Sequence, residues 1–556
     1  MIARDPISDL PTHQVTNQVP PLIDYNLFAS DPGLQEALRR EGAGWAEETV
    51  HAFGAAIGTA DSIARGEAAN RHPPQLHSFD RFGQRIDFVE YHPAYHALMA
   101  QGLEAGIHSL PASGRPGAFV AHAALEYMLT QVEPGVCCPI TMTGASLAVL
   151  LQNEGLHAEW APLIIANAYD PAAGPATAKR GATIGMAMTE KQGGSDVRTN
   201  TTLARPLGGD HYELTGHKWF CSAPMSDGFL TLAQAPGGLT CFFTPRWRPD
   251  GKRNPIFIQR LKDKLGNRSN ASAEIEYAGA LAWRIGEEGR GVATIMAMVN
   301  QTRLDAALVC AGMMRHCAVE AVHHAAHRKA FGMHLIDQPL MQTVLADLVI
   351  EAEAATALVM RIARAFDGGS PEETAFARIG AAIAKFWVTK RLPNHSYEAL
   401  ECLGGNGFVE EGPLARFYRE APVNAIWEGS GNVNALDVLR ALARERASLG
   451  ALRMELEASK GLDRDYDRFL SGIEAGLQDL ASAEPTARRL VEDLALGLQA
   501  SLLLRHAPAD VAETFVAGRL NGGMRGCYGA LPAGLKLGPI LERAVVGSAK
   551  VPATLK

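Results

Sequence analysis

Six short apolar or alternating segments between residues 181 and 287 constrain the fold of this chain more than any other feature. They are "ATIGMAMTE", "HYELTGHKWFCS", "FLTLAQA", "LTCFFTP", "NPIFIQRL" and "ASAEIEYAG", and Gly, Pro, Asp or Asn separate them. Segments of this length and pattern indicate β-strands. On both sides of this region apolar residues recur at the helical period of three to four. We therefore expect a mainly α protein with a small, antiparallel central β-domain.

Four domains are expected from these changes of pattern. They are an N-terminal arm and helical domain (residues 1–180), the β-domain (181–287), a helical bundle (288–445) and a C-terminal helical domain (446–556). In the first domain, Asp31-Pro32 predicts a helix start, because proline is favoured in the first turn of a helix. Three long periodic segments, 291–330, 339–367 and 373–402, are joined by short links and predict the bundle.

Charge and hydropathy exclude several classes of protein. The chain has 556 residues, with 52 Lys and Arg against 60 Asp and Glu, so a nucleic-acid site must be a local basic patch. No run reaches the roughly 18–20 apolar residues of a membrane span, and "MIARDPISDLPTHQ" lacks the pattern of a signal peptide. Eight scattered cysteines without a CxxC pair favour reduced thiols. We expect a cytoplasmic protein with no membrane partner.

A loop after the first expected strand, "GMAMTEKQGGSDVRTN" (185–200), could hold a cofactor. Thr189 and Ser195 offer hydroxyls, while Gly193 and Gly194 leave backbone amides open to a ring edge or a pyrophosphate. The loop has neither GxGxxG nor the lysine of a P-loop, which argues against a Rossmann or Walker site. An ordinary β-turn is the alternative.

Three further segments are candidates of the same kind. They are "GHKWFCSA" (216–223), with aromatic side chains that could flank a flat ring; "AHRKAFGMHLIDQP" (326–339), with Arg328 as a phosphate clamp; and "ECLGGNGFVEEGPLARFYRE" (401–420), with exposed glycine amides. Each has a structural alternative: a core-facing strand, a solvated arginine at a helix end, and a helix cap with its turn.

The segment "NAIWEGSGN" (424–432) places Glu428 between the apolar pair Ile426 and Trp427 and a flexible glycine-rich run. An acid beside an apolar wall has a raised pKa and can serve as a base. An acid that caps a helix is the alternative. His323 and His327 lie one helical turn apart, but no further ligand accompanies them, so we expect no metal site.

Taken together and in order, these segments resemble the acyl-CoA dehydrogenase superfamily over roughly residues 50–445. "TEKQGGSD" and "ECLGGNGFVEEGPLARFYRE" resemble its two signatures, and "IWEGSGN" resembles its catalytic-base segment. A closer resemblance, nearly end to end, is to the AidB branch, flavoproteins of the adaptive response to DNA alkylation. The segments that carry it include "REGAGW", "PITMTGA", "GMAMTEKQGGSDV", "RLKDKLGNRSNAS" and "PVNAIWEGSGN".

The resemblance implies a helical domain, a β-barrel domain, a four-helix domain and an added C-terminal domain. It also implies one FAD per subunit at a site shared with a neighbour, and hence a homotetramer. The residues that it matches to FAD contacts are Met186, Thr189, Gly194, Ser195, Phe220, Cys221, Ser222, Arg328, Phe331, Gln338, Gly404, Gly405, Ser430 and Asn432. Phe220, Ser222 and Glu401 stand where the family usually has Trp, Thr and Gln, respectively.

For activity, the resemblance implies Glu428 as the base that removes the α-proton of an acyl thioester, with weak dehydrogenation of isovaleryl-CoA-like substrates. It also implies binding of double-stranded DNA by the last domain and inactivation of alkylating agents. Residues 501–556 contain seven Lys and Arg against three Asp and Glu, which fits a phosphate-binding face. The expected DNA contacts are Arg440, Arg519, Arg525, Lys536 and Arg543.

Two other functions remain open from the sequence. One is a metabolic short- or branched-chain acyl-CoA dehydrogenase whose tail docks a protein partner. The other is an oxidase that uses O₂ on a small electron-rich compound.

Overall fold

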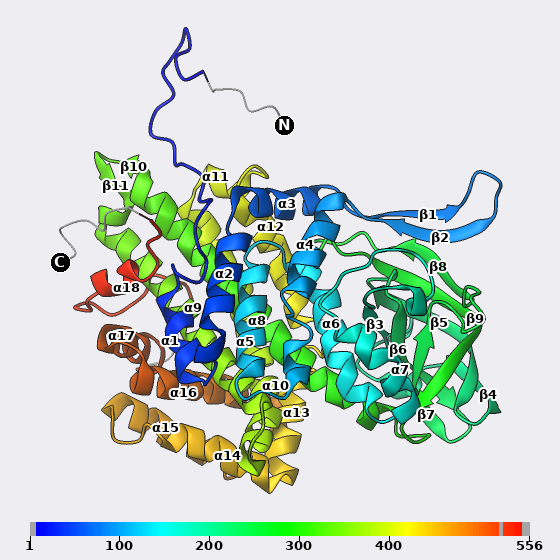
Figure 1. The fold of residues 1–556 in the computed structure, drawn as a ribbon. Coiled ribbons are helices and arrows are strands. Elements are labelled where there is room, and N and C mark those ends of the chain that lie inside the picture. The colour runs from blue at the N-terminus through cyan, green and yellow to red at the C-terminus, as the bar shows by residue number, and fades with distance from the viewer. Residues whose placement is uncertain (1–6, 522–525, 548–556) are drawn as a thin grey trace.

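The computed structural model describes residues 7–521 and 526–547. Figure 1 shows a large helical body beside a smaller β-domain, with an extended N-terminal arm and a β-hairpin that project from the body. The arm leads into α1 (Pro32–Arg40), where the side chain of Asp31 caps the helix by accepting from the Leu34 amide at 3.0 Å. The expected helix start at Asp31-Pro32 is thus confirmed.

Six more helices and one hairpin complete the N-terminal region. The helices are α2 (Glu47–Ile57), α3 (Ala60–Arg71), α4 (Pro93–Glu104), α5 (Ala118–Thr130), α6 (Pro134–Leu150) and α7 (Glu154–Ile164). The hairpin pairs β1 (Gln75–Phe79) with β2 (Arg85–Glu90) in antiparallel register. The expectation of mostly helix from residue 30 to 180 is wrong for this hairpin. Its alternating exposed and buried residues and its turn at Gly83, with φ +78°, are strand and turn signals.

The β-domain is a mixed sheet rather than an antiparallel one. Its strands are β3 (Ile184–Ala187), β4 (Leu203–Gly208), β5 (His211–Ser222), β6 (Gly228–Ala235), β7 (Gly238–Pro245), β8 (Ile256–Leu261) and β9 (Ser272–Ile285). The order is β3-β6-β4-β5-β9-β7, β8 pairs with β9, and an added β6–β7 pairing closes the path on itself. Strands β3 and β4 run parallel to β6, which corrects the antiparallel expectation. Strand β4 was not among the six expected strands.

The helical bundle follows the expected periodic segments closely. It contains α8 (Gly291–His327), the short hairpin β10 (Lys329–Ala330) and β11 (Met333–His334), α9 (Pro339–Phe366), α10 (Pro371–Cys402), α11 (Gly405–Phe408), α12 (Pro413–Glu420) and α13 (Gly431–Arg444). Helices α8, α9 and α10 pack on one another along their length. Most of the side chains of α8 are buried, as expected for the central helix of a bundle.

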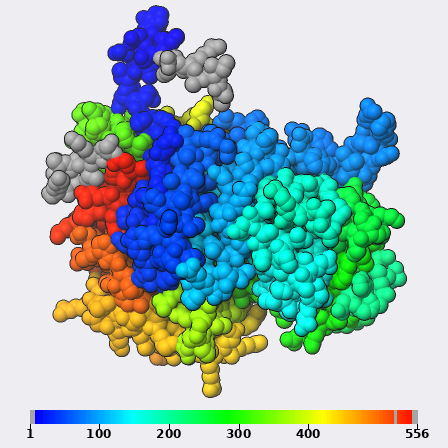
Figure 2. All heavy atoms as spheres, viewed as in Figure 1, coloured from blue at the N-terminus to red at the C-terminus, as the bar shows by residue number. Residues whose placement is uncertain are grey.

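The C-terminal helices pack onto the bundle without an intervening gap. They are α14 (Arg446–Glu457), α15 (Arg464–Gly476), α16 (Ala487–His506), α17 (Ala509–Arg519) and α18 (Gly538–Glu542), and α16 lies against α9, α10 and α13. Figure 2 shows the orange and red C-terminal residues directly against the blue N-terminal ones. One apolar cluster therefore runs from Leu27 to Ala544. Within the described residues, none of the helices is both long and apolar enough for a bilayer crossing.

Candidate active site

Glu428 lies in a strained bend between the 3₁₀ turn Ala421–Ala425 and the start of α13. Its φ is +56°, in the left-handed region that costs a non-glycine residue energy unless its surroundings enforce it. Thr302 of α8 donates to Glu428 Oε2 at 2.6 Å, and Arg303 Nε donates to the Glu428 carbonyl at 3.3 Å. Lys385 of α10 donates to the next carbonyl, that of Gly429. Two helices of the bundle therefore hold the bend in place.

The electrostatics of this bend suit a base. Burial raises the pKa of Glu428 above its usual value, although the Thr302 hydrogen bond and the charges of Lys385 and Arg303 oppose the rise. Burial also lowers the pKa of Lys385 to about 8. Arg303 is itself neutralised by Asp437 at 2.6 Å. A carboxylate with a raised pKa is a stronger proton acceptor than a free glutamate.

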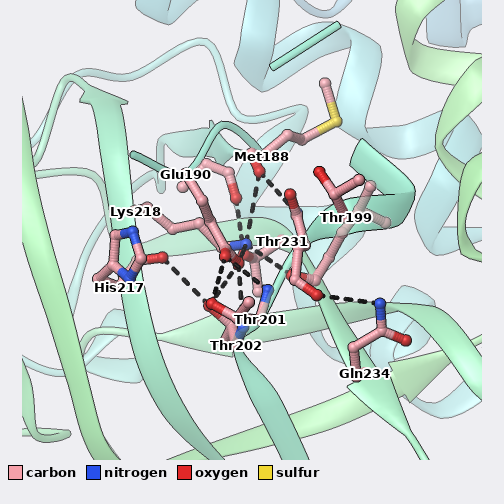
Figure 3. A network of polar contacts seen from close by, with 12 residues as sticks. Met188, Glu190, Thr199, Thr201, Thr202, His217, Lys218, Thr231 and Gln234 are labelled. Carbon is pink, nitrogen blue, oxygen red and sulfur yellow. Dashed lines mark hydrogen bonds and ion pairs between the residues drawn. The ribbon is translucent and has the colours of Figure 1, made fainter. Parts of the chain in front are cut away.

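The loop of residues 185–200, called here the first-signature loop, is anchored by a buried ion pair at the centre of Figure 3. Lys218 Nζ of β5 donates to Glu190 Oε1 at 2.9 Å and to the Leu232 carbonyl at 2.7 Å. Glu190 also accepts from the Thr201 amide and the Thr202 hydroxyl, each at 2.6 Å. Both charged side chains are fully buried. Removing either partner would leave the other as an unpaired buried charge. The pair therefore holds the loop in a fixed position against β5.

Sequence reasoning missed Glu190 and Lys218 as a pair. Glu190 stands between polar residues in a loop, and Lys218 is a charged residue within a strand, so neither suggests a buried partner. Burial lowers the pKa of Lys218 to about 8, although the charge of Glu190 opposes this, and the pKa of Glu190 lies well below its usual range. The alternation of β5 would have placed Lys218 on the buried face, which was the available signal.

Several polar and aromatic groups near the Glu428 bend and the first-signature loop could contact a ligand. Phe220, at the end of β5, is 47% exposed, and Ser222 Oγ lies 3.1 Å from Ser272 Oγ. Within the described residues, both side-chain amide atoms of Asn270 and Asn424, and Trp427 Nε1, are buried without a hydrogen-bond partner. Such orphaned groups, together with the exposed aromatic side chain of Phe220, fit a large planar cofactor with many polar atoms.

Cys138 of α6 links the two segments in space. Its side chain packs against the apolar cluster that also contacts Met186 and Met188 of the first-signature loop. Burial raises the pKa of the Cys138 thiol to about 12, and the charge of Glu428 adds to the rise. Cys138 of α6 is therefore close to Glu428 and packs on the same apolar cluster as the first-signature loop.

The expected cofactor residues of the β-domain and of the start of α13 differ in how exposed they are to solvent. Thr189 and Ser222 are half-buried, and Gly194 and Ser195 are exposed. A side chain at Gly194 would collide with Thr189, since its Cβ would lie 2.5 Å from Thr189 Oγ1. Met186 is half-buried, Ser430 is half-buried at the start of α13, and Asn432 is exposed on its first turn. Cys221 is completely buried, so only its backbone could reach a cofactor.

A second set of expected cofactor residues lies at the far side of the helical body. Arg328 and Phe331 flank β10, and Figure 1 shows the β10–β11 hairpin on the side of the body away from the β-domain. Phe331 is 98% exposed, Gln338 donates to the Ala330 carbonyl at 3.2 Å, and Arg328 donates to the Asn17 carbonyl. One chain therefore does not bring Phe331 to Phe220. Gly404 and Gly405 have open space where a Cβ would stand.

Two expected DNA contacts are corrected by their surroundings. Arg519 is buried, and its Nη2 lies 2.5 Å from Asp347 Oδ1 and 2.8 Å from Glu351 Oε2. Arg543 is paired with Glu353 at 2.7 Å and with Glu36 at 2.8 Å. Neither guanidinium is available to a phosphate, because carboxylates already occupy its donors. Arg440 and Lys536 are exposed, and Arg525 lies outside the described residues.

Three family models match the chain in sequence order between residues 17 and 443. They are the adaptive response protein AidB N-terminal domain (residues 17–171), the acyl-CoA dehydrogenase middle domain (185–280) and the acyl-CoA dehydrogenase C-terminal domain (289–443). The putative acyl-CoA dehydrogenase AidB of Escherichia coli K12 is 45% identical over 520 residues, which covers 92% of this chain and 96% of that protein.

Solved structures show the same architecture. Caenorhabditis elegans ACDH-11 in complex with C11-CoA superposes with a TM-score of 0.83 at 27% identity, covering 94% of this chain and 96% of that one. An acyl-CoA dehydrogenase complexed with FAD from Bacillus anthracis shares the fold, with a TM-score of 0.60 at 19% identity over 77% of this chain and 78% of that one.

Proposed function

The chain belongs to the acyl-CoA dehydrogenase family, and we propose that Glu428 is the base of its reaction. As a member of this family it is an FAD-dependent oxidoreductase that acts on CH–CH groups. The observation that carries the proposal is the strained bend at Glu428, held by Thr302, Arg303 and Lys385. A strained residue that its surroundings enforce marks a functional position.

The donor set around the bend fits FAD, and the bound flavin supplies the acceptor for the hydride that leaves the β-carbon. We propose that Thr189, Ser195, Phe220 and Ser222 hold the cofactor on the β-domain side. Arg328, Phe331, Gln338, Gly404 and Gly405 would hold it from a neighbouring copy. This division supports an oligomer such as the proposed homotetramer, because the β10–β11 hairpin, whose turn carries the exposed Phe331, lies on the side of the protomer away from the β-domain.

Glu428 takes the α-proton of the substrate through one oxygen. Thr302 donates to Oε2, so Oε1 is the atom left to accept the proton. Burial disfavours the carboxylate, and the proton transfer relieves that cost by making the group neutral. Thr302 and Arg303 keep the carboxyl group aimed in one direction, which limits the reorganisation needed for the transfer.

We propose that the substrate is an acyl-CoA, a class that the ACDH-11 complex with C11-CoA supports by likeness. Anaerobic titration of the FAD-loaded protein with acyl-CoAs of increasing length, isovaleryl-CoA included, should bleach the flavin with at least one of them. The visible absorbance spectrum records this reduction. Bleaching by none would reject the acyl-CoA proposal and favour an oxidase or a reaction with alkylating agents.

We further propose that the protein binds double-stranded DNA and serves in the response to alkylation, where it inactivates alkylating agents. The match to the adaptive response protein AidB N-terminal domain, together with the likeness to AidB of Escherichia coli, supports the role in such a response. Exposed arginines on α13, α14 and α16, three helices that pack on one another, could contact phosphates. They are Arg440, Arg444, Arg446, Arg488 and Arg489. Arg440 and Arg444 share one face of α13, since they are four residues apart.

The double variant Arg440→Gln/Arg444→Gln should bind DNA more weakly than the wild type. Each lost phosphate contact lowers the slope of log K against log salt by about 1, so we expect a slope smaller by about 2. Fluorescence anisotropy with a labelled duplex at several salt concentrations measures it. The matched control is Arg81→Gln/Lys252→Gln, which removes two exposed charges beside the β-domain. Equal weakening in both variants would show only a loss of net charge and would reject this DNA face.

A further inference from the structure

Three buried ionisable side chains meet between α5, α6 and α8. They are His122 and Glu126 of α5 and Asp305 of α8, each at most 1% exposed. His122 Nε2 lies 3.2 Å from Asp305 Oδ1 and 3.4 Å from Glu126 Oε2. Thr141 of α6 donates to Glu126 Oε1 at 2.7 Å. The reaction derived above does not use this cluster.

The hydrogen bond on the other side of the ring fixes the tautomer of His122. His122 Nδ1 lies 2.7 Å from the Ile107 carbonyl oxygen, which can only accept, so Nδ1 carries a hydrogen. A neutral imidazole would then direct the lone pair of Nε2 at two carboxylates. Within the described residues, no Lys or Arg side chain bonds to the cluster. Two protons or a divalent cation must therefore balance its charge.

The ligand geometry favours protons over a metal ion. A structural zinc site has four protein ligands, and a catalytic one has three with a fourth position open to water. The cluster offers three groups in a closed interior, and Thr141, its nearest polar neighbour, is engaged as a donor to Glu126. It lacks both the fourth ligand and the open position.

The protons settle on His122 and Glu126. Burial opposes the charge on His122, but Asp305 and Glu126 outweigh it and raise its pKa to about 9. Burial, with the charge of Asp305, raises the pKa of Glu126 to about 8. Burial also raises the pKa of Asp305, although the charge and hydrogen bond of His122 oppose the rise. Because His122 Nε2 is hydrogen-bonded to Asp305 Oδ1 at 3.2 Å, we assign the carboxylate to Asp305 and the second proton to Glu126 at neutral pH.

The cluster borders the base through α8. Asp305 follows Thr302 by three residues, which places both on one side of the helix, and Thr302 donates to Glu428. We propose that His122, Glu126 and Asp305 form a closed proton-holding centre. The negative charge of Asp305, one helical turn after Thr302, keeps Glu428 a strong base. The inference rests on the proposed role of Glu428.

Other titratable groups face the centre from each neighbouring element. Cys137 of α6 lies near Glu126, and His108, which follows α4, lies near His122. The negative charge of Asp305 contributes to the rise in the pKa of Glu428. Burial raises the pKa of Cys137 and lowers that of His108 to about 4, so both stay neutral near pH 7. Outside the centre, Glu428 is therefore the group through which the charge of Asp305 can affect the reaction.

Three variants separate the members of the centre. The readout is the pH dependence of flavin reduction by isovaleryl-CoA. Asp305→Asn removes the negative charge, so the acid limb of its pH–rate profile, where Glu428 becomes protonated, should move to lower pH. His122→Gln leaves that charge uncompensated and should move the limb to higher pH. Glu126→Gln replaces a group that is already neutral and should leave the limb unchanged. Equal profiles for all four proteins would overturn the proposal.

Unfolding temperature against pH is the second measurement and needs no substrate. The pKa of His122 is raised in the folded state, so its stabilisation is complete below about pH 6.5 and is lost as pH rises through about 9. The wild type should therefore lose stability over this range, and His122→Gln should lose less. Stoichiometric divalent metal in elemental analysis would overturn the proposal. If Glu428→Gln reacts at the wild-type rate, the role of Glu428 fails, while the unfolding curves still test the centre.

Discussion

Replacing Glu428 with glutamine is expected to slow reduction of the bound flavin by an acyl-CoA about 10³-fold. Glutamine can keep the contact with Thr302, because its amide oxygen accepts as the carboxylate Oε2 does at 2.6 Å. It cannot take a proton from the α-carbon. Anaerobic stopped-flow absorbance with the substrate found in the acyl-CoA titration measures the rate. The FAD content of the purified variant should equal that of the wild type.

The matched control is Glu411→Gln, which makes the same change at an exposed acid after α11. Its reduction rate should stay at the wild-type value. Wild-type reduction by the Glu428 variant would show that the strained bend serves another purpose. Loss of FAD from that variant would instead point to a structural role of the acid in the cofactor site.

Replacing Arg519 with glutamine is expected to lower the free energy of unfolding by about 3–5 kcal/mol. The change removes the partner of two buried carboxylates, Asp347 at 2.5 Å and Glu351 at 2.8 Å. Arg391 still contacts Glu351 at 3.1 Å, but Asp347 keeps no cationic partner within the described residues. Denaturant unfolding followed by circular dichroism measures the loss, and the affinity for a DNA duplex should not change while the protein is folded.

Arg468→Gln is the control, since Arg468 is 72% exposed and pairs with Asp465 on its own helix. Its effect on stability should stay within about 0.5 kcal/mol. If the Arg519 variant unfolds like the wild type and yet loses DNA affinity, then Arg519 contacts phosphate and is not held by Asp347 and Glu351.

The long helices could be predicted because their signal is local. The periodic segments 291–330, 339–367 and 373–402 correspond to α8, α9 and α10 within a few residues at each end. The missed strand β4 is short, and its last four residues are exposed, so its segment lacks an apolar alternation. The mixed order of the sheet depends on pairings between distant strands, such as β3 with β6, which no local pattern records.

The site was predicted only where one segment carries the chemistry. Glu428 stands in a distinctive segment, but its partner Thr302 is 126 residues away in a helix with no motif. Arg519 was assigned to DNA because a count of charges does not include its partner Asp347, 172 residues earlier. Charge composition therefore indicates how many basic residues a region has and not which of them are free.

Helix α13 sets the distance between the segment of the base and Arg440. It begins at Gly431, three residues after Glu428, and carries Arg440 nine residues further on. At 1.5 Å per residue the helix separates Gly431 from Arg440 by roughly 14 Å. Its buried face packs on α10, α14 and α16, so the helix acts as a rigid spacer. A polyanion held at Arg440 would therefore stay at a fixed distance from the start of the helix, next to the base.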